Sequence, residues 1–156
     1  MTLKATQVVP RADDRRTLGR TAAWLAKRVE IGLGSVDLSL PQYRVLGMLD
    51  GSSALSSDLA ERLAVRPPTV TSVVDGLVAR GLVERRTVKG DRRRVDHVLT
   101  DHGRQVLDAA DDAVNTQLLE IAGHLGDDAD ADRAFEGLTL WRRALLASRL
   151  ARSTAR

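Results

Sequence analysis

The fold of this chain is decided by residues 55–103, LSSDLAERLAVRPPTVTSVVDGLVARGLVERRTVKGDRRRVDHVLTDHG. Apolar residues recur three and four positions apart in the first half, which predicts helices, and then alternate, which predicts strands. Pro67 and Pro68 divide the helical half, because proline cannot continue a helix but suits the first turn of a new one. We therefore expect two short helices joined by a turn, followed by a β-hairpin.

Both helices carry start and stop signals. The first should begin at Ser56 or Ser57, since a serine hydroxyl can accept a hydrogen bond from a free N–H at a helix start. The second should begin near Pro67, and Gly81 fits a left-handed cap after its end. Its inward face is predicted from apolar residues at helical spacing: Val70, Val73, Val74 and Leu77.

Small hydroxyl side chains at the front of the second helix fit against base edges and phosphates. An arginine just before the helix would suit a phosphate. We therefore treat this helix as a candidate recognition helix that enters a DNA major groove. Its candidate contacts are Arg66, Pro67, Pro68, Thr69, Thr71 and Ser72.

The hairpin is strongly basic. Its strands are expected at residues 82–84 and 95–99, with a loop from Thr87 to Arg94 between them. Residues 62–94 contain nine arginines or lysines and only three acids, a net +6. On a hairpin directly after a helix-turn-helix, such charge is expected to contact phosphates and the minor groove. The candidate wing residues are Lys89, Asp91, Arg92, Arg93 and Arg94.

Three further arginines have a structural alternative. These are Arg80, Arg85 and Arg86, and neighbouring acids could hold them in ion pairs instead of leaving them to DNA. The nearest candidate partners in the sequence are Asp75, Glu84 and Asp91.

Several short motifs follow one another in this stretch: LA, PPTVT, LVARGLVER, DRR, and LT with a glycine three residues on. In this order they resemble the MarR (multiple antibiotic resistance regulator) family of transcription factors. The resemblance is close over residues 40–105 and loose elsewhere. It implies a winged helix-turn-helix in which Arg93 enters the minor groove while Asp91 holds the wing through ion pairs. The chain departs from the family pattern at Ser72, where many relatives have arginine, and Arg94 makes the wing more basic than the motif requires.

Helices are also predicted before the decisive stretch. The first runs from Arg11 to about Leu33 and is ended by Gly32 and Gly34. A second starts at Ser39, a good N-cap residue, and closes at Gly51. Residues 1–10 are expected to form a mobile N-terminal tail.

Two longer helices are predicted after it. Thr100 should cap the first of them, the segment from Gly126 interrupts the pattern, and a last helix covers residues 131–151. Long helices with one apolar side need a partner, and a second copy of the chain is the simplest one. The expected fold is mainly α with a small β-hairpin wing: a winged helix-turn-helix (37–103) flanked by a helical dimerisation region (11–36 and 104–156).

Composition excludes several other classes of protein. With 156 residues and a net charge of +3, the chain suits one domain with helical extensions. The absence of cysteine excludes disulfides and thiol redox sensing. No stretch suits a signal peptide or a membrane span, so we expect a cytoplasmic protein without a membrane partner.

Neither a metal nor a catalytic site is predicted. The histidines, His97, His102 and His124, lack the spacing of a zinc motif. Acidic pairs such as Asp111 with Asp112 have no nucleophile or phosphate cradle beside them. We therefore expect no cofactor and no enzymatic activity.

The resemblance also implies a ligand site. In that family an aromatic or phenolic small molecule often binds between the dimer helices and the DNA-reading head. Trp24 and Tyr43 lie on segments that would line such a crevice, which makes them a hypothetical ligand pocket. The alternative is that both side chains only pack, because a tryptophan on a packing seam needs no ligand to explain it.

The sequence thus predicts a sequence-specific DNA-binding regulator, a dimeric repressor that acts at a palindromic operator, and the family resemblance implies that a small aromatic ligand releases it. Two alternatives stay open. One is an architectural DNA-binding protein without an effector. The other is a winged-helix module that binds a protein partner.

Overall fold

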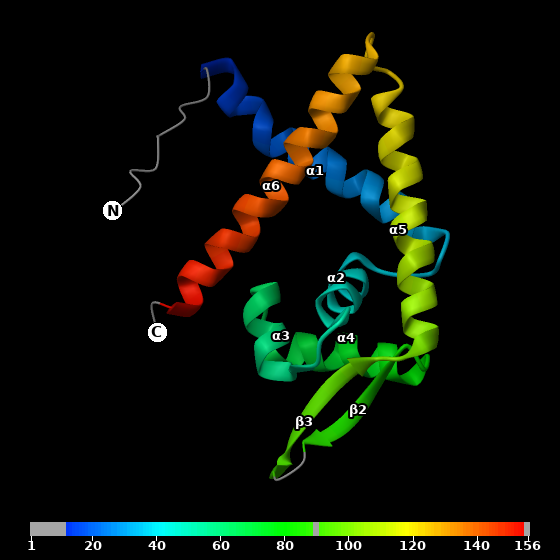
Figure 1. Cartoon of the computed structure of the whole chain (residues 1–156), viewed down its shortest axis with the longest axis vertical. Helices are drawn as coiled ribbons and strands as arrows, with labels where there is room; N and C mark the ends of the chain where they lie inside the picture. Colours follow the sequence, from blue (N-terminus) through cyan, green and yellow to red (C-terminus); the bar gives the residue numbers. More distant parts are fainter. Residues whose placement is uncertain (1–11, 89–90, 155–156) are drawn as a thin grey trace.

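A computed structural model describes residues 12–88 and 91–154. It places a small head, made of three short helices and a sheet, below three long helices (Figure 1). The predicted mainly α fold with a small β wing is confirmed. In chain order the elements are α1 (Ala12–Gly34), α2 (Leu40–Leu49), β1 (Ala54–Leu55), α3 (Ser56–Leu63), α4 (Pro67–Ala79), β2 (Val83–Val88), β3 (Asp91–Leu99), α5 (Asp101–Ala122) and α6 (Asp128–Thr154).

The sheet has three antiparallel strands in the order β1-β3-β2. The sequence did not predict β1, because two residues are too few to show an alternating pattern. The expected loop from Thr87 to Arg94 is wrong: β2 reaches Val88 and β3 starts at Asp91, so only residues 89–90 lie between the strands. An exposed two-stranded ribbon can carry charge on both faces, so its strands need no apolar alternation.

The hairpin also contains an irregularity near its tip. Thr87 pairs with Val95, whereas the next residue, Val88, pairs with Asp91. Three residues of β3 therefore have no counterpart on β2. Such a bulge increases the local twist and bends the strand. It falls within the run of three arginines.

The core of the head is built mainly from leucine and valine. Val70, Val74 and Leu77 of α4 are fully buried, and Val73 is partly buried, which confirms the predicted inward face. Because a step of three or four residues comes close to one helical turn, these side chains form one stripe on the helix. The opposite face of α4 is left in solvent.

Two helix ends in the head show left-handed residues. Gly81 follows α4 with φ of +68°, and Leu82 N–H donates to the Leu77 carbonyl oxygen at 3.0 Å, so the predicted glycine cap is confirmed. Ala64 ends α3 in the same conformation, with φ of +55°. The predicted serine cap of α3 is wrong: β1 runs directly into the helix, so Leu55 occupies the N-cap position and no side chain caps it.

The long helices α1 and α5 pack against each other. Gly32 and Gly34 were expected to end α1; the helix ends at Gly34, as predicted, whereas Gly32 lies inside its last turn. A Cβ atom at Gly32 would lie 2.9 Å from the Ala113 carbonyl oxygen of α5. Glycine at this position therefore permits close approach of two backbones.

Thr100 caps α5 as predicted. Its hydroxyl accepts a hydrogen bond from Gly103 N–H at 2.9 Å and donates to the Gly81 carbonyl oxygen at 2.7 Å. One threonine thus joins the start of α5 to the turn that ends α4.

The last helix stands apart from the head. It begins at Asp128, three residues before the predicted start, because the acidic residues of its first turn suit the positive end of a helix. Figure 1 shows α6 diverging from α5 below the turn that joins them. In the described part of the chain, no helix is long and apolar enough to cross a membrane.

Candidate nucleic-acid interface

The N-terminal face of α4 is open to solvent. Arg66 occupies the N-cap position, and its carbonyl oxygen accepts a hydrogen bond from Thr69 N–H at 3.0 Å. The prolines occupy the first turn, where no N–H is needed. All six predicted contact residues of this helix are exposed: Arg66, Pro67, Pro68, Thr69, Thr71 and Ser72.

Two kinds of polar group are present on this face. Thr71 donates its hydroxyl proton to the Pro67 carbonyl oxygen at 3.2 Å, so it retains only acceptor capacity for a ligand. Arg66 makes no ion pair with any residue in the described ranges, and neither does Arg62 of α3. Both guanidinium groups are thus available for an external anion.

The predicted wing is placed only by its backbone. Asp91, Arg92, Arg93 and Arg94 form the first part of β3, next to the hairpin tip. Their side chains, and Lys89 as a whole, lie outside the described residues. The three arginines that follow Asp91 fall in the bulge of the hairpin.

Three other arginines of the head, Arg80, Arg85 and Arg86, have protein partners. Arg85 of β2 forms an ion pair with Asp75 of α4, and Arg86 pairs with Glu84. Arg80 donates to the Asp37 carbonyl oxygen at 2.6 Å, a partner that the sequence did not suggest. These exposed pairs contribute little to stability, but they orient the side chains.

The turn that Arg80 contacts explains this partner. Asp37 has φ of +53°, and Leu38 N–H donates to the Leu33 carbonyl oxygen at 3.1 Å, a left-handed cap on α1. The cap turns a carbonyl group toward the end of α4. Sequence separation of 43 residues hides such a contact from any local pattern.

The comparisons with known proteins agree with this geometry. A family model described as "MarR family" matches residues 36–94. The HTH-type transcriptional regulator YfiV of Bacillus subtilis (strain 168) is 30% identical over 121 residues, which cover 73% of this chain and 75% of that protein. This chain belongs to the MarR family of transcriptional regulators.

Solved structures show the same fold. A mutant of MarR from E. coli superposes with a TM-score of 0.72 at 21% identity, covering 87% of this chain and 99% of that one. A mutant of MepR from S. aureus, bound to an oligodeoxyribonucleotide, gives a TM-score of 0.61 at 19% identity, covering 84% of this chain and 96% of that one.

The two aromatic residues of the hypothetical ligand pocket have different surroundings in this MarR-family chain. Trp24 of α1 is 71% exposed. Tyr43 of α2 is half-buried and donates its hydroxyl proton to Asp111 of α5. Burial, the hydrogen bond and the negative charge of Asp111 together raise the pKa of Tyr43 above its ordinary value. Tyr43 thus joins the head to a long helix.

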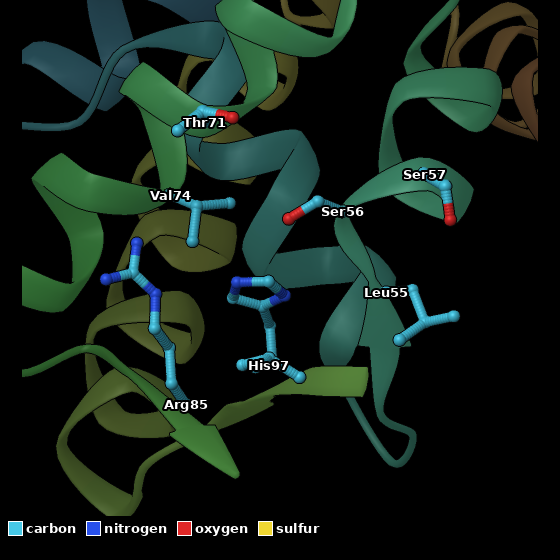
Figure 2. A pocket seen from close by; sticks show the side chains of 8 residues that line it. Leu55, Ser56, Ser57, Thr71, Val74, Arg85 and His97 are labelled. Atoms are coloured by element: carbon cyan, nitrogen blue, oxygen red, sulfur yellow. The ribbon is translucent and has the colours of Figure 1, made fainter. Parts of the chain in front are cut away.

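A pocket of about 420 Å³ lies elsewhere, between α3, α4 and the sheet (Figure 2). Among its described lining residues, only Thr71 was a predicted site residue. The most buried polar one is His97 of β3, which is 3% exposed. Side chains alternate between the two faces of a strand, so His97 lies on the inner face and Asp96 on the opposite one. This alternation is the signal in the sequence that could have predicted the burial of His97. The lining residues are Leu55, Ser56, Ser57, Thr71, Val74, Arg85, Val95 and His97.

Proposed function

We propose that this MarR-family regulator is a homodimeric, sequence-specific repressor that binds a palindromic operator. The observation that carries the proposal is the solvent-exposed N-terminal face of α4, where Thr69 and Ser72 stand beside Arg66, which forms no ion pair with a described residue. A helix of this kind fits the major groove, and the hairpin beside it suits the adjacent minor groove. MepR, which shares the fold, is bound to an oligodeoxyribonucleotide in its structure.

The long helices support the dimer. Several large apolar side chains of α6 are exposed, among them Trp141 at 66% and Leu145 at 56%. Exposed apolar faces of this kind mark interaction surfaces. We therefore assign residues 11–36 and 104–156 to dimerisation and residues 37–103 to DNA binding. A two-fold dimer requires half-sites about one helical turn, roughly 10 bp, apart.

A small aromatic ligand would release the repressor. We place its site between the long helices and the head, near Trp24 and Tyr43, because the Tyr43–Asp111 hydrogen bond crosses from α2 to α5 there. A ligand that prefers one spacing of the two recognition helices shifts the dimer toward that spacing. Titration with a panel of aromatic acids should change both tryptophan fluorescence and DNA affinity. No change with any of them would remove the ligand from the proposal.

DNA binding is tested by fluorescence anisotropy on the duplex upstream of the protein's own gene, against a scrambled duplex, over a salt series. A specific repressor should prefer the native duplex by a factor of about 10³ or more. Arg93→Ala should weaken binding to all sequences and reduce the salt slope, whereas Arg133→Ala on α6 should not.

Two results would contradict the proposal. Equal affinity for both duplexes, lost together as salt rises, would favour an architectural DNA-binding protein. Full retention of affinity in the Arg93→Ala variant would remove the wing from the interface.

A further inference from the structure

The pocket in the head holds an imidazole with one free nitrogen. His97 is 3% exposed, and its Nδ1 lies 3.2 Å from the Ala54 carbonyl oxygen. A carbonyl oxygen can only accept, so Nδ1 carries a proton and donates it. The other nitrogen, Nε2, has no hydrogen-bond partner within the described residues. Figure 2 shows the ring pointing into the pocket, between Ser56 and Arg85.

The start of α3 forms a second wall of the pocket. Leu55, Ser56 and Ser57 line it, and no side chain caps this helix. The first N–H groups of an uncapped helix, together with the helix dipole, favour an anion. Figure 2 shows the Ser56 hydroxyl turned toward the pocket, whereas that of Ser57 is turned away. The free donors of α3 therefore lie on the same pocket as Nε2 of His97.

One cationic side chain also lines the pocket. Arg85 lines the pocket, and its ion pair with Asp75 uses only part of the guanidinium group. Among the described residues, Arg85 from β2 and its partner Asp75 from α4 are the charged groups at this site, and Asp58 lies in the first turn of α3 without lining the pocket. The lining includes no charged residue from α2, α3 or β1. The apolar residues of the remaining walls strengthen attraction between an anion and these donors.

The pocket also lies where a DNA strand would pass. Its lining comes from α4 on one side and from both strands of the hairpin on the other. With α4 in the major groove and the hairpin in the adjacent minor groove, the backbone strand that separates the grooves runs between them. The mouth of the pocket would therefore face phosphates.

We propose that this pocket binds one phosphate of the operator backbone, held by the start of α3, Arg85 and Nε2 of His97. The inference rests on the proposed DNA binding. Because Nδ1 already carries a proton, Nε2 can donate to the phosphate only after the ring gains a second one. Phosphate binding is therefore coupled to proton uptake, and operator affinity rises as the pH falls.

The test combines a pH series with chemically modified DNA. Duplexes carrying a single uncharged methylphosphonate at each position are titrated with the wild-type protein at pH 6 and pH 8. We expect one position in each half-site at which the modification weakens binding by about three- to tenfold. Unmodified duplex should bind about tenfold more tightly at pH 6 than at pH 8.

Two substitutions of the same residue separate the roles of its nitrogens. His97→Asn can retain the bond to Ala54 but lacks Nε2, so it should lose both the pH effect and the sensitivity to that methylphosphonate. His97→Gln can place an amide donor near Nε2 and should bind with little dependence on pH. His124→Asn, the same change in the exposed turn after α5, should behave as wild type.

The outcomes are distinct. If the wild-type protein binds the operator but every methylphosphonate that weakens it also weakens His97→Asn equally, the phosphate site is refuted while the repressor function stands. If inorganic phosphate binds beside His97 but no DNA phosphate does, the pocket binds a free anion and the inference is wrong. If the Asn variant does not fold, the Gln variant and the wild-type pH series decide. Absence of any operator binding refutes both proposals.

Discussion

Replacing Gly103 with alanine should test how α5 is fixed to the head. A Cβ atom at Gly103 would lie 2.0 Å from the Leu82 carbonyl oxygen and 2.9 Å from Leu99 Cδ1. The carbonyl oxygen cannot easily move, because it accepts Thr100 N–H at 3.1 Å. The added methyl group must therefore displace the first turn of α5 from the strand that it packs on.

The expected loss follows from two opposing terms. Overpacking against a rigid neighbour costs about 1–3 kcal/mol, and a backbone neighbour places this site near the upper end. Alanine regains about 1 kcal/mol of helix propensity relative to glycine. The net destabilisation is about 2 kcal/mol, which corresponds to a fall in Tm of about 4–8 °C for a chain of this size.

Gly47→Ala is the matched control. Gly47 lies inside α2, is exposed, and has no atom within 4 Å of a built Cβ. The same chemical change should raise stability there by about 0.5–1 kcal/mol. Both variants are compared with wild type by urea denaturation and far-UV circular dichroism at one protein concentration, because the stability of the proposed dimer would depend on concentration. A Gly103→Ala variant as stable as the Gly47→Ala variant would refute the contact with Leu82.

Three further predictions concern other parts of the chain. Tyr43 is the only tyrosine, so the absorbance of tyrosinate reports its ionisation alone. Because its pKa is raised, Tyr43 should ionise in the native protein only above pH ~10. Asp111→Asn should lower the pH at which Tyr43 ionises part of the way back. Because the folded pKa is raised, Tyr43 contributes its full stabilisation below pH ~10 and loses it above. Ala64→Gly should stabilise the protein by about 1 kcal/mol in the same urea assay, since φ of +55° suits glycine. Trp141→Glu should give a folded monomer by light scattering; an unchanged dimer would remove α6 from the interface.

The parts of the fold that the sequence predicted are those with local causes. Pro67 sets the start of α4, Gly81 supplies the positive φ after it, and Thr100 supplies the hydroxyl that caps α5. Each signal acts within four residues along the chain. The exposed face of α4 follows from the same periodicity, because its inward stripe fixes what remains outside.

The parts that it did not predict depend on contacts between distant segments. Gly32 looked like a helix terminator because its role, closeness to Ala113, involves a residue 81 positions away. The strand β1 is defined only by its pairing with β3. That one nitrogen of His97 is free could not be predicted, because this depends on which carbonyl group its other nitrogen contacts. Local periodicity carries none of this information.

In the proposed dimer, the contacts of α5 would limit how the two candidate recognition helices can change their spacing. Its first half is joined to the head by Thr100, by an ion pair of 2.8 Å between Arg104 and Asp50, and by Tyr43, which donates to Asp111. From residue 100 to residue 111 the helix spans about 16 Å, so the head and this half of α5 are held together at both ends of that length. The other half packs on α1. A ligand that changes the spacing must therefore act on the packing of the long helices, or break the Tyr43–Asp111 bond. Removing that bond with Tyr43→Phe should loosen the head from α5 and weaken the response of DNA affinity to the proposed ligand while leaving the α4 surface unchanged.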